Sequence, residues 1–167
     1  MACSLNKITI HWTAGRNIPN ATDMEHYHFL IDNHGLLYKG KFEPEDNINC
    51  QDGKYAQHCG GGNTGNIGVA FCGCYVPKGV SVKDTQFPLT QIQLERGFKL
   101  CADLCKKYKI PINKDHVFTH YEFGLAHPQT SSAGKIDITY LHSNPTISKD
   151  TIGSYMRGKI LWYAQHS

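Results

Sequence analysis

The chain has 167 residues, of which 40% are apolar and 19% are charged, and its formal net charge is +3. This composition is typical of one globular domain with a real core, and it excludes a disordered or fibrous chain. The weak positive charge suits an anionic polymer but not nucleic acid, and no apolar run reaches the ~20 residues that span a bilayer, so we expect no membrane insertion.

The cysteines and the first residues together indicate a reducing compartment. Seven cysteines are present, an odd number, and the start (MACSLNK) is neither basic nor apolar enough for a secretory signal peptide. We therefore expect synthesis in the cytoplasm without a signal peptide. We also expect reduced thiols rather than a framework of disulfides.

Strands are predicted first along the chain. Residues 6–12 (NKITIHW) alternate in the manner of a strand, with Ile8 and Ile10 on one face and the histidine on the other. Residues 26–32 and 36–41 flank an Asn-His-Gly turn, which predicts a β-hairpin.

Two further strands are predicted on either side of a glycine-rich loop. They cover residues 55–59 and 67–73, and the apolar character of the second is typical of a central, buried strand. The loop at residues 60–65 lacks the Gly-Lys-Ser/Thr ending of a P-loop, so we reject a phosphate-binding role for it.

Helices dominate the second half of the chain. Residues 89–108 form the clearest one, because Thr90 and Gln93 have the spacing of a capping box and apolar residues then recur every three or four positions. A short strand is predicted at 117–120 and a final helix at about 148–162. With no repeat or linker, residues 1–167 are predicted to be a single α/β domain with a central mixed β-sheet flanked by helices.

The ten histidines are the compositional oddity, and they prompt a search for metal ligands. His11 and His120 each lie at the end of a predicted strand, and extended geometry would put Lys135 and Asp137 on one face of their segment. Two imidazoles and one carboxylate are a standard ligand set for catalytic zinc, with water in the fourth position. His127 is an alternative third ligand. Taken alone, these residues indicate a possible metal hydrolase and no more.

Several motifs then occur in an order that resembles a known family. They are HWTAG, YHFLIDNHG, YAQHCG followed by NTGNIGVAF, the capped helix at Thr90, THYEFG and GKID. The chain resembles the N-acetylmuramoyl-L-alanine amidases, which share a fold with bacteriophage endolysins, anhydro-muropeptide amidases and peptidoglycan recognition proteins. The resemblance covers residues 6 to 165, and its weight comes from the agreement of separate motifs in order.

The resemblance implies a site and a reaction. His11, His120 and Asp137 are expected to bind one Zn²⁺, which lowers the pKa of its water towards ~7. Lys135 is expected to stabilise the oxyanion that forms on the substrate carbonyl. Tyr27 is expected either to hydrogen-bond the attacking water or to protonate the departing nitrogen. The expected substrate is the bond between N-acetylmuramic acid and the L-alanine of peptidoglycan.

The sequence departs from the family pattern at three places. Ile138 follows the predicted ligand Asp137 where many members have Pro-Gly, and the central strand lacks the glutamate of the recycling enzymes at residues 70–72. The stretch between residues 12 and 26 is short, so the helix usually found there is expected to be short or absent and the groove more open.

Three biological roles are compatible with the resemblance. We favour a phage or prophage endolysin, expected as a monomer that reaches peptidoglycan after the membrane is permeabilised. A cytosolic recycling amidase acting on anhydro-muropeptides is the alternative suggested by the aspartate ligand. A non-catalytic peptidoglycan-binding protein is the third, although all three ligands are retained.

Some residues have an ordinary interpretation beside the functional one. Tyr27 could simply pack on the sheet, and His58 could line the groove or be inert. Cys72 and Cys74, with Cys59 or the pair Cys101/Cys105, could form a second zinc site, but we favour buried free thiols.

Overall fold

A five-stranded mixed sheet organises the computed structural model, which describes residues 4–166. The strands lie in the order β3-β2-β4-β1-β5. β1 is parallel to both β4 and β5, β2 is parallel to β4, and β2 and β3 form an antiparallel hairpin. The bounds are β1 (Lys7–Trp12), β2 (Phe29–Ile31), β3 (Leu37–Lys39), β4 (Asn66–Phe71) and β5 (Val117–Thr119). The predicted fold class is confirmed.

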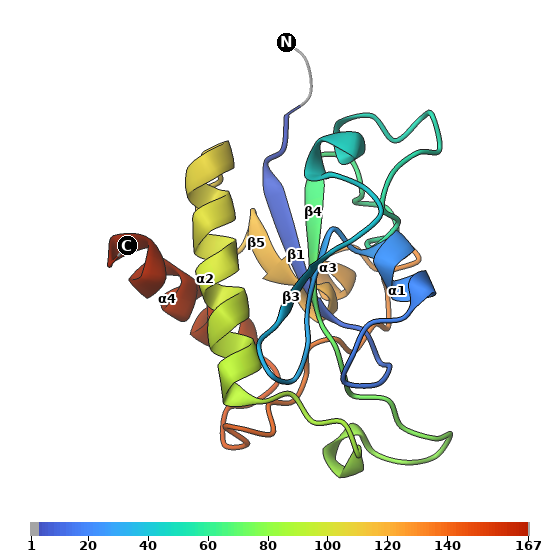
Figure 1. Ribbon diagram of the computed structural model, residues 1–167, viewed down its shortest axis with the longest axis vertical. Helices are drawn as coiled ribbons and strands as arrows, with labels where there is room; N and C mark the ends of the chain where they lie inside the picture. Colours follow the sequence, from blue (N-terminus) through green and yellow to red (C-terminus); the bar gives the residue numbers. More distant parts are fainter. Residues whose placement is uncertain (1–3, 167) are drawn as a thin grey trace.

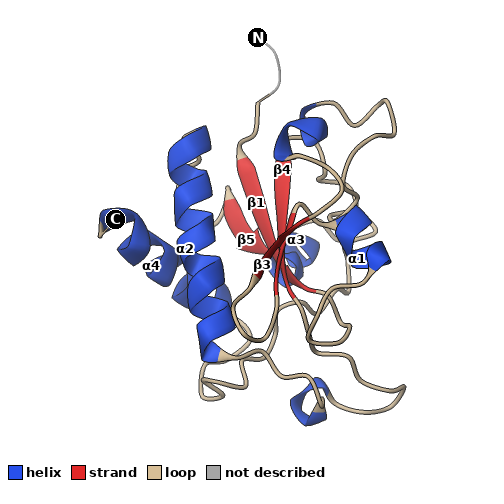
Figure 2. Ribbon diagram, in the orientation of Figure 1, coloured by secondary structure: helices blue, strands red, loops and turns tan. Residues whose placement is uncertain are grey.

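Helices cover both faces of this sheet (Figures 1 and 2). The two long helices, α2 and α4, lie side by side on one face, while the short helices α1 and α3 lie on the other. Their bounds, with the two 3-10 helices, are α1 (Ala21–His26), η1 (Pro44–Ile48), η2 (Val82–Asp84), α2 (Gln91–Tyr108), α3 (His120–Ala126) and α4 (Ile152–Gln165). None of the helices described combines the length and the apolar character needed to cross a bilayer.

The face under α2 and α4 is apolar. Ile8 and Ile10 of β1 belong to one buried cluster with Phe98 of α2 and Met156 of α4. Each such side chain contributes roughly 1.5–3 kcal/mol by leaving water. The helix α2 begins as predicted, because the Thr90 hydroxyl accepts from the Gln93 N–H and the Gln93 side chain accepts from the Thr90 N–H.

The opposite face of the same strands is also buried, and polar groups lie there beside two small apolar clusters, one around Leu30 and one around Phe118. Thr9 and His11 alternate with the isoleucines of β1, and His28 and Asn66 lie on the neighbouring strands or at their ends. Each of these buried groups is hydrogen-bonded, as burial of a polar group requires.

The strand predicted at residues 55–59 is wrong. This segment is irregular because asparagine side chains take the place of a neighbouring strand. The Ala56 N–H donates to Asn47 Oδ1, and the N–H groups of His58 and Cys59 both donate to Asn63 Oδ1.

Other boundaries need correction. The strand predicted from residue 26 begins at Phe29, because His26 ends α1 and Tyr27 caps it. The strand predicted to include His120 ends one residue earlier, and His120 opens α3, a helix that the sequence analysis does not predict. The last helix starts at Ile152 rather than near residue 148. The GKID segment is irregular and turned rather than extended.

The thiols agree with the favoured prediction for the part of the chain that is described. Six cysteines there are free. Among residues 4–166, none of them joins a group of three metal-ligating atoms, so a second zinc site has no support. Cys3 and the start of the chain, on which the expectation about a signal peptide rests, lie outside the described residues.

Candidate metal centre

Three predicted ligands come together at the carboxyl ends of adjacent parallel strands. His11 is the penultimate residue of β1, and His120 follows the end of β5. Asp137 arrives on the loop after α3. One ligand atom from each lies within 4.8 Å of the others, and all three residues are buried. The carboxyl ends of parallel strands are a common place for binding sites in such sheets.

The first turn of α3 holds His120 in place. Thr119 caps this helix through a hydrogen bond from the Glu122 N–H, and the Glu122 carboxylate accepts from the Thr119 N–H in return. Arg157 of α4 then donates to both oxygens of Glu122, at 2.8 and 3.0 Å. The ligand-bearing turn is therefore tied to a helix on the opposite face of the sheet.

The carboxylate of Asp137 lies between the two imidazoles. Its Oδ2 is 2.9 Å from Nδ1 of His11, and its Oδ1 is 3.4 Å from Nδ1 of His120. The Tyr121 N–H donates to the Asp137 carbonyl over 2.6 Å, which fixes the loop against α3.

The second nitrogen of His120 reveals which tautomer the site selects. Nε2 lies 2.9 Å from the Ser132 hydroxyl, and that hydroxyl donates to the Gly60 carbonyl over 2.7 Å. Because the hydroxyl proton of Ser132 is already donated to the Gly60 carbonyl, the Ser132 oxygen accepts a hydrogen bond from the Nε2–H of His120. A neutral His120 therefore turns a lone pair on Nδ1 towards Asp137. Lone-pair donors facing one another in this way fit a divalent cation.

The ionisation of the three groups reflects their crowding. Burial lowers the pKa of His11 to about 4, although Asp137 opposes the shift. Burial also disfavours charge on His120, but its contacts with Asp137 and Cys59 outweigh burial and raise the pKa to about 9. The pKa of Asp137 lies below its usual value because the two histidines overcome the effect of burial. Without a cation, His120 thus binds a proton that a metal ion would displace.

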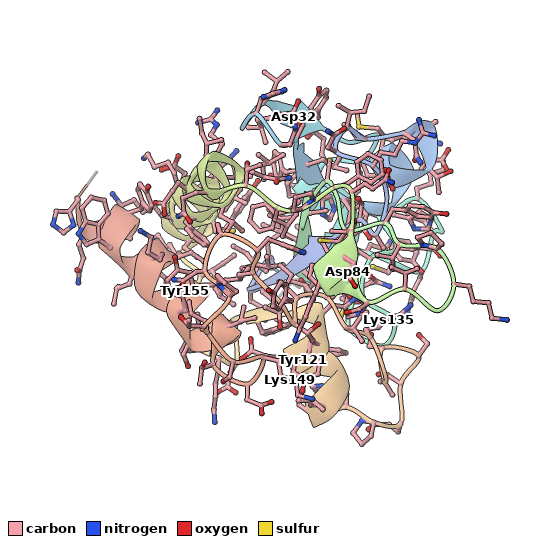
Figure 3. The ribbon with its side chains drawn as sticks, turned by 90° about the horizontal axis from the view of Figure 1, so that it is seen from below. Asp32, Asp84, Tyr121, Lys135, Lys149 and Tyr155 are labelled. Carbon is pink, nitrogen blue, oxygen red and sulfur yellow. The ribbon has the colours of Figure 1, made fainter. Side chains whose placement is uncertain are left out.

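A groove of about 930 Å³ opens over these ligands. Its walls include Tyr27, His58, Val76, Val80, Lys135 and Ile136. The Tyr27 ring lies 5.0 Å from that of His11, and burial, followed by Asp137, raises the pKa of its phenol. Figure 3 views the molecule from below, towards the carboxyl ends of the strands, and labels Lys135 on the segment after α3.

Comparison with known families decides the assignment. A family model described as N-acetylmuramoyl-L-alanine amidase matches residues 3–137, which is most of the chain. The chain belongs to the N-acetylmuramoyl-L-alanine amidase family. The match ends at Asp137, so it includes all three residues of the cluster. A search of curated proteins gave no match.

Several solved structures are similar to this member of the amidase family. A mutant structure of PlyL is 19% identical, covers 99% of this chain and 88% of its own, and has a TM-score of 0.50. LysC, an N-acetylmuramoyl-L-alanine amidase from Clostridium intestinale URNW, is 20% identical, with coverages of 72% and 73% and a TM-score of 0.48. Drosophila peptidoglycan recognition protein SD is 16% identical, with coverages of 78% and 76% and a TM-score of 0.49.

The amidase site differs from the sequence-based picture in its surroundings. His127, the alternative third ligand, lies outside the cluster, where it stacks on Phe123 and bonds that residue's carbonyl. Ser132, which orients His120, is not among the predicted site residues, and nothing in its local sequence marks it. His58 is only a candidate groove residue in the sequence, yet its ring touches His11. Tyr27 lines the groove and also packs against the sheet beside Leu30, and its catalytic role stays a prediction.

Proposed function

We propose that this amidase family member is a zinc-dependent enzyme that hydrolyses the amide bond between N-acetylmuramic acid and L-alanine in peptidoglycan. The observation that carries the proposal is the convergence of His11, His120 and Asp137 beside an open groove that the last two residues line. Family membership supplies the reaction type, and the cluster supplies the place where it would occur.

The donor set supports zinc as the cation. Nδ1 of His11, Nδ1 of His120 and one oxygen of Asp137 would hold it, and two imidazoles with one carboxylate match a catalytic zinc site. When bound, zinc supplies Lewis acidity, which polarises a carbonyl and lowers the pKa of water. Ser132 keeps His120 oriented through Nε2, as the outer partner of a ligating histidine does.

Lys135 and Tyr27 serve the reaction from the walls of the groove. The ammonium group of Lys135 stabilises the negative charge that develops on the lactyl carbonyl oxygen. The phenol of Tyr27 is protonated at neutral pH, as an ordinary tyrosine is, and burial raises its pKa further, so it acts as a hydrogen-bond donor. We assign it a hydrogen bond to the departing alanine nitrogen.

The shape of the groove favours a polymeric substrate and the endolysin setting. The helix α1, which lies beside the site, spans only residues 21–26 and leaves the groove open towards solvent. An open groove suits a glycan strand that extends on both sides of the N-acetylmuramic acid whose lactyl amide is cleaved. In this setting the chain acts as a monomer on the cell wall once the membrane is permeabilised.

Digestion of purified Gram-negative sacculi tests the proposal. Wild type, His120→Ala and zinc-stripped protein are compared, and the products are analysed by mass spectrometry. We expect free stem peptides beginning at L-alanine from the wild type only, with activity restored by added zinc. Cleavage of soluble anhydro-muropeptides but not sacculi would instead indicate cell-wall recycling. Binding to sacculi without turnover of either substrate would overturn the catalytic assignment.

A further inference from the structure

His58 lies buried between the metal cluster and the polar face of the sheet. Its Nδ1 is 3.0 Å from Nε2 of His11, and its own Nε2 is 2.9 Å from the backbone carbonyl of Asn66. The rings of His58 and His11 meet edge to face, with centroids 5.1 Å apart. His58 therefore contacts the ligand on the side away from Asp137.

These two contacts determine where the protons lie. A carbonyl oxygen can only accept, so Nε2 of His58 must carry a proton. A neutral His58 then has its lone pair on Nδ1. This nitrogen must accept a hydrogen bond from the Nε2–H of His11. Since His11 is neutral with its proton on Nε2, its Nδ1 carries a lone pair. That lone pair faces Asp137 from 2.9 Å, where only a cation or a proton can join the two.

The neighbours of His58 are consistent with its neutral form. No carboxylate lies among its hydrogen-bond partners in the described chain, and its second ring neighbour is another imidazole, His28, at 5.6 Å. The Gly68 N–H donates to Nδ1 of His28, so the proton of neutral His28 lies on Nε2. That N–H donates a hydrogen bond to Asn47 Oδ1. A second proton on His58 would have to be buried without a counter-charge, which is costly.

The seat of His58 is rigid. A Cβ atom at Gly68 would lie 2.6 Å from the imidazole of His58, so only glycine leaves room for the ring. The accepting residue, Asn66, is itself fixed, because its side chain accepts from Thr9 and donates to the Gly62 carbonyl. The backbone of His58 is held by Asn63.

We propose that His58, with the Asn66 carbonyl, is a positioning residue that locks His11 in the tautomer needed to bind the metal through Nδ1. The proposal deepens the proposed function and rests on it for the identity of the ion. His58 does not touch the substrate's reacting atoms in this role. It sets the direction of the ligand's lone pair.

The tautomers themselves are measured first, on the zinc-free wild type. Nitrogen-15 NMR of histidine-labelled protein at neutral pH distinguishes a protonated from an unprotonated ring nitrogen, and His58→Gln identifies the His58 signals by their loss. We expect the proton on Nε2 in both His11 and His58. A His11 ring whose only proton is on Nδ1, or a proton on Nδ1 of His58, would overturn the proposal whether or not the enzyme is active.

Zinc affinity then separates orientation from ordinary structural support. His58→Gln keeps a donor for the Asn66 carbonyl but loses the acceptor for His11, and it should weaken zinc binding by about 10–100-fold. His58→Asn places an oxygen near the position of Nδ1 and should restore most of that affinity. His28→Gln is the matched control, since His28 is equally buried and hydrogen-bonded but does not touch a ligand.

The outcomes are distinct from those that test the function. If the wild type binds no zinc, the proposed function fails, while the NMR result still decides the tautomer of His11. If the wild type binds zinc and His58→Gln binds it equally well, the function stands and the role of His58 is wrong. Equal losses of affinity in His58→Gln and His28→Gln would also overturn the role, because they would mean general support of the fold.

Discussion

The two faces of the sheet are built from the same strands but differ in how many polar side chains they bury. Under α2 and α4, Ile8, Ile10 and Phe98 belong to one large apolar cluster. On the other face, Thr9 and His11 enter a network of buried histidines and asparagines. Alternation along β1 thus separates the part that stabilises the domain from the part that carries the proposed chemistry.

The energetics of the two faces differ accordingly. Apolar burial contributes roughly 25 cal/mol for each Å² removed from water, and it is largely indifferent to geometry. A buried hydrogen bond contributes only about 0.5–1.5 kcal/mol net, but a lost partner leaves an unsatisfied group. The polar face is therefore a means of orientation more than of stability, and variants should separate the two properties.

Asp137→Ala should cause the largest loss, and it should be a loss of function. Removing the carboxylate takes away one ligand of the proposed zinc site, so we expect kcat/KM to fall by at least about 10³-fold, equivalent to several kcal/mol. Zinc content by mass spectrometry should fall with it. Asp84→Ala, an exposed carboxylate of η2, is the control and should keep both. Full activity of Asp137→Ala would sink the assigned ligand set.

Phe98→Ala tests the apolar face, and it should lower stability without changing function. Its ring is fully buried, so truncation should cost about 3–5 kcal/mol in the free energy of unfolding, measured with urea. Below the new unfolding midpoint, zinc affinity and kcat should stay as in the wild type. Ile92→Ala, at a site 62% exposed on α2, should change stability by no more than about 0.5 kcal/mol. A Phe98 variant with lost zinc affinity would show that the faces are coupled.

Lys135→Ala should lower kcat by about 10²–10³-fold, the usual cost of removing a group that stabilises an oxyanion. Zinc affinity should not fall, because an ammonium group offers the metal no lone pair. Steady-state kinetics and zinc titration of the same preparation measure both. The exposed Lys149→Ala serves as the matched control of charge. A loss of zinc instead of kcat would give Lys135 a purely structural role.

The smallest expected effect is the pH dependence of the free energy of unfolding of the zinc-free chain, and its direction is fixed by the two histidine pKa values. The pKa of folded His120, about 9, lies above its ordinary value of 6.5. Its proton therefore stabilises the fold fully below about pH 6.5, and this contribution is lost as pH rises through about 9. His11, with a pKa of about 4, acts oppositely and costs stability as pH falls from 6.5 to 4.

Urea unfolding across this range measures both contributions. Zinc should abolish the loss between pH 7 and 9, since the metal replaces the proton on His120. In His120→Ala the same loss should be absent without zinc. If the stability of the zinc-free wild type were constant from pH 7 to 9, the raised pKa of His120 in the folded chain would be wrong.

The faces also differ in how well the sequence predicts them. β1 and α2 are predictable because their side chains repeat with the period of the element, and β4 because a short apolar run is typical of a buried strand. The helix α3 escapes prediction although Thr119 and Glu122 have capping-box spacing, because it is only one or two turns long. Residues 55–59 are wrongly predicted as a strand, since the bonds from Asn47 and Asn63 depend on tertiary structure.

The candidate site shows the same division. His11 and His120 stand in motifs, so a family resemblance is enough to mark them before their geometry is known. Ser132 and His58 act through contacts with residues distant in sequence, and no local pattern predicts such a contact. Their positions follow from how the glycine-rich loop and the segment after α3 close on the strand ends.

The central position of β1 has a consequence for the fidelity of folding. Its register against β4 and β5 places Ile8 and Ile10 in the apolar layer and, at the same time, His11 among the candidate metal ligands. A slip of one residue would bury the histidine among hydrocarbons and expose the isoleucines to the polar network. Misfolded copies with an assembled but faulty centre should therefore be rare, because the strand pairing that buries the core also sets the ligand geometry. Redesign of this chain has more freedom in the groove wall at Val76 and Val80 than anywhere along β1.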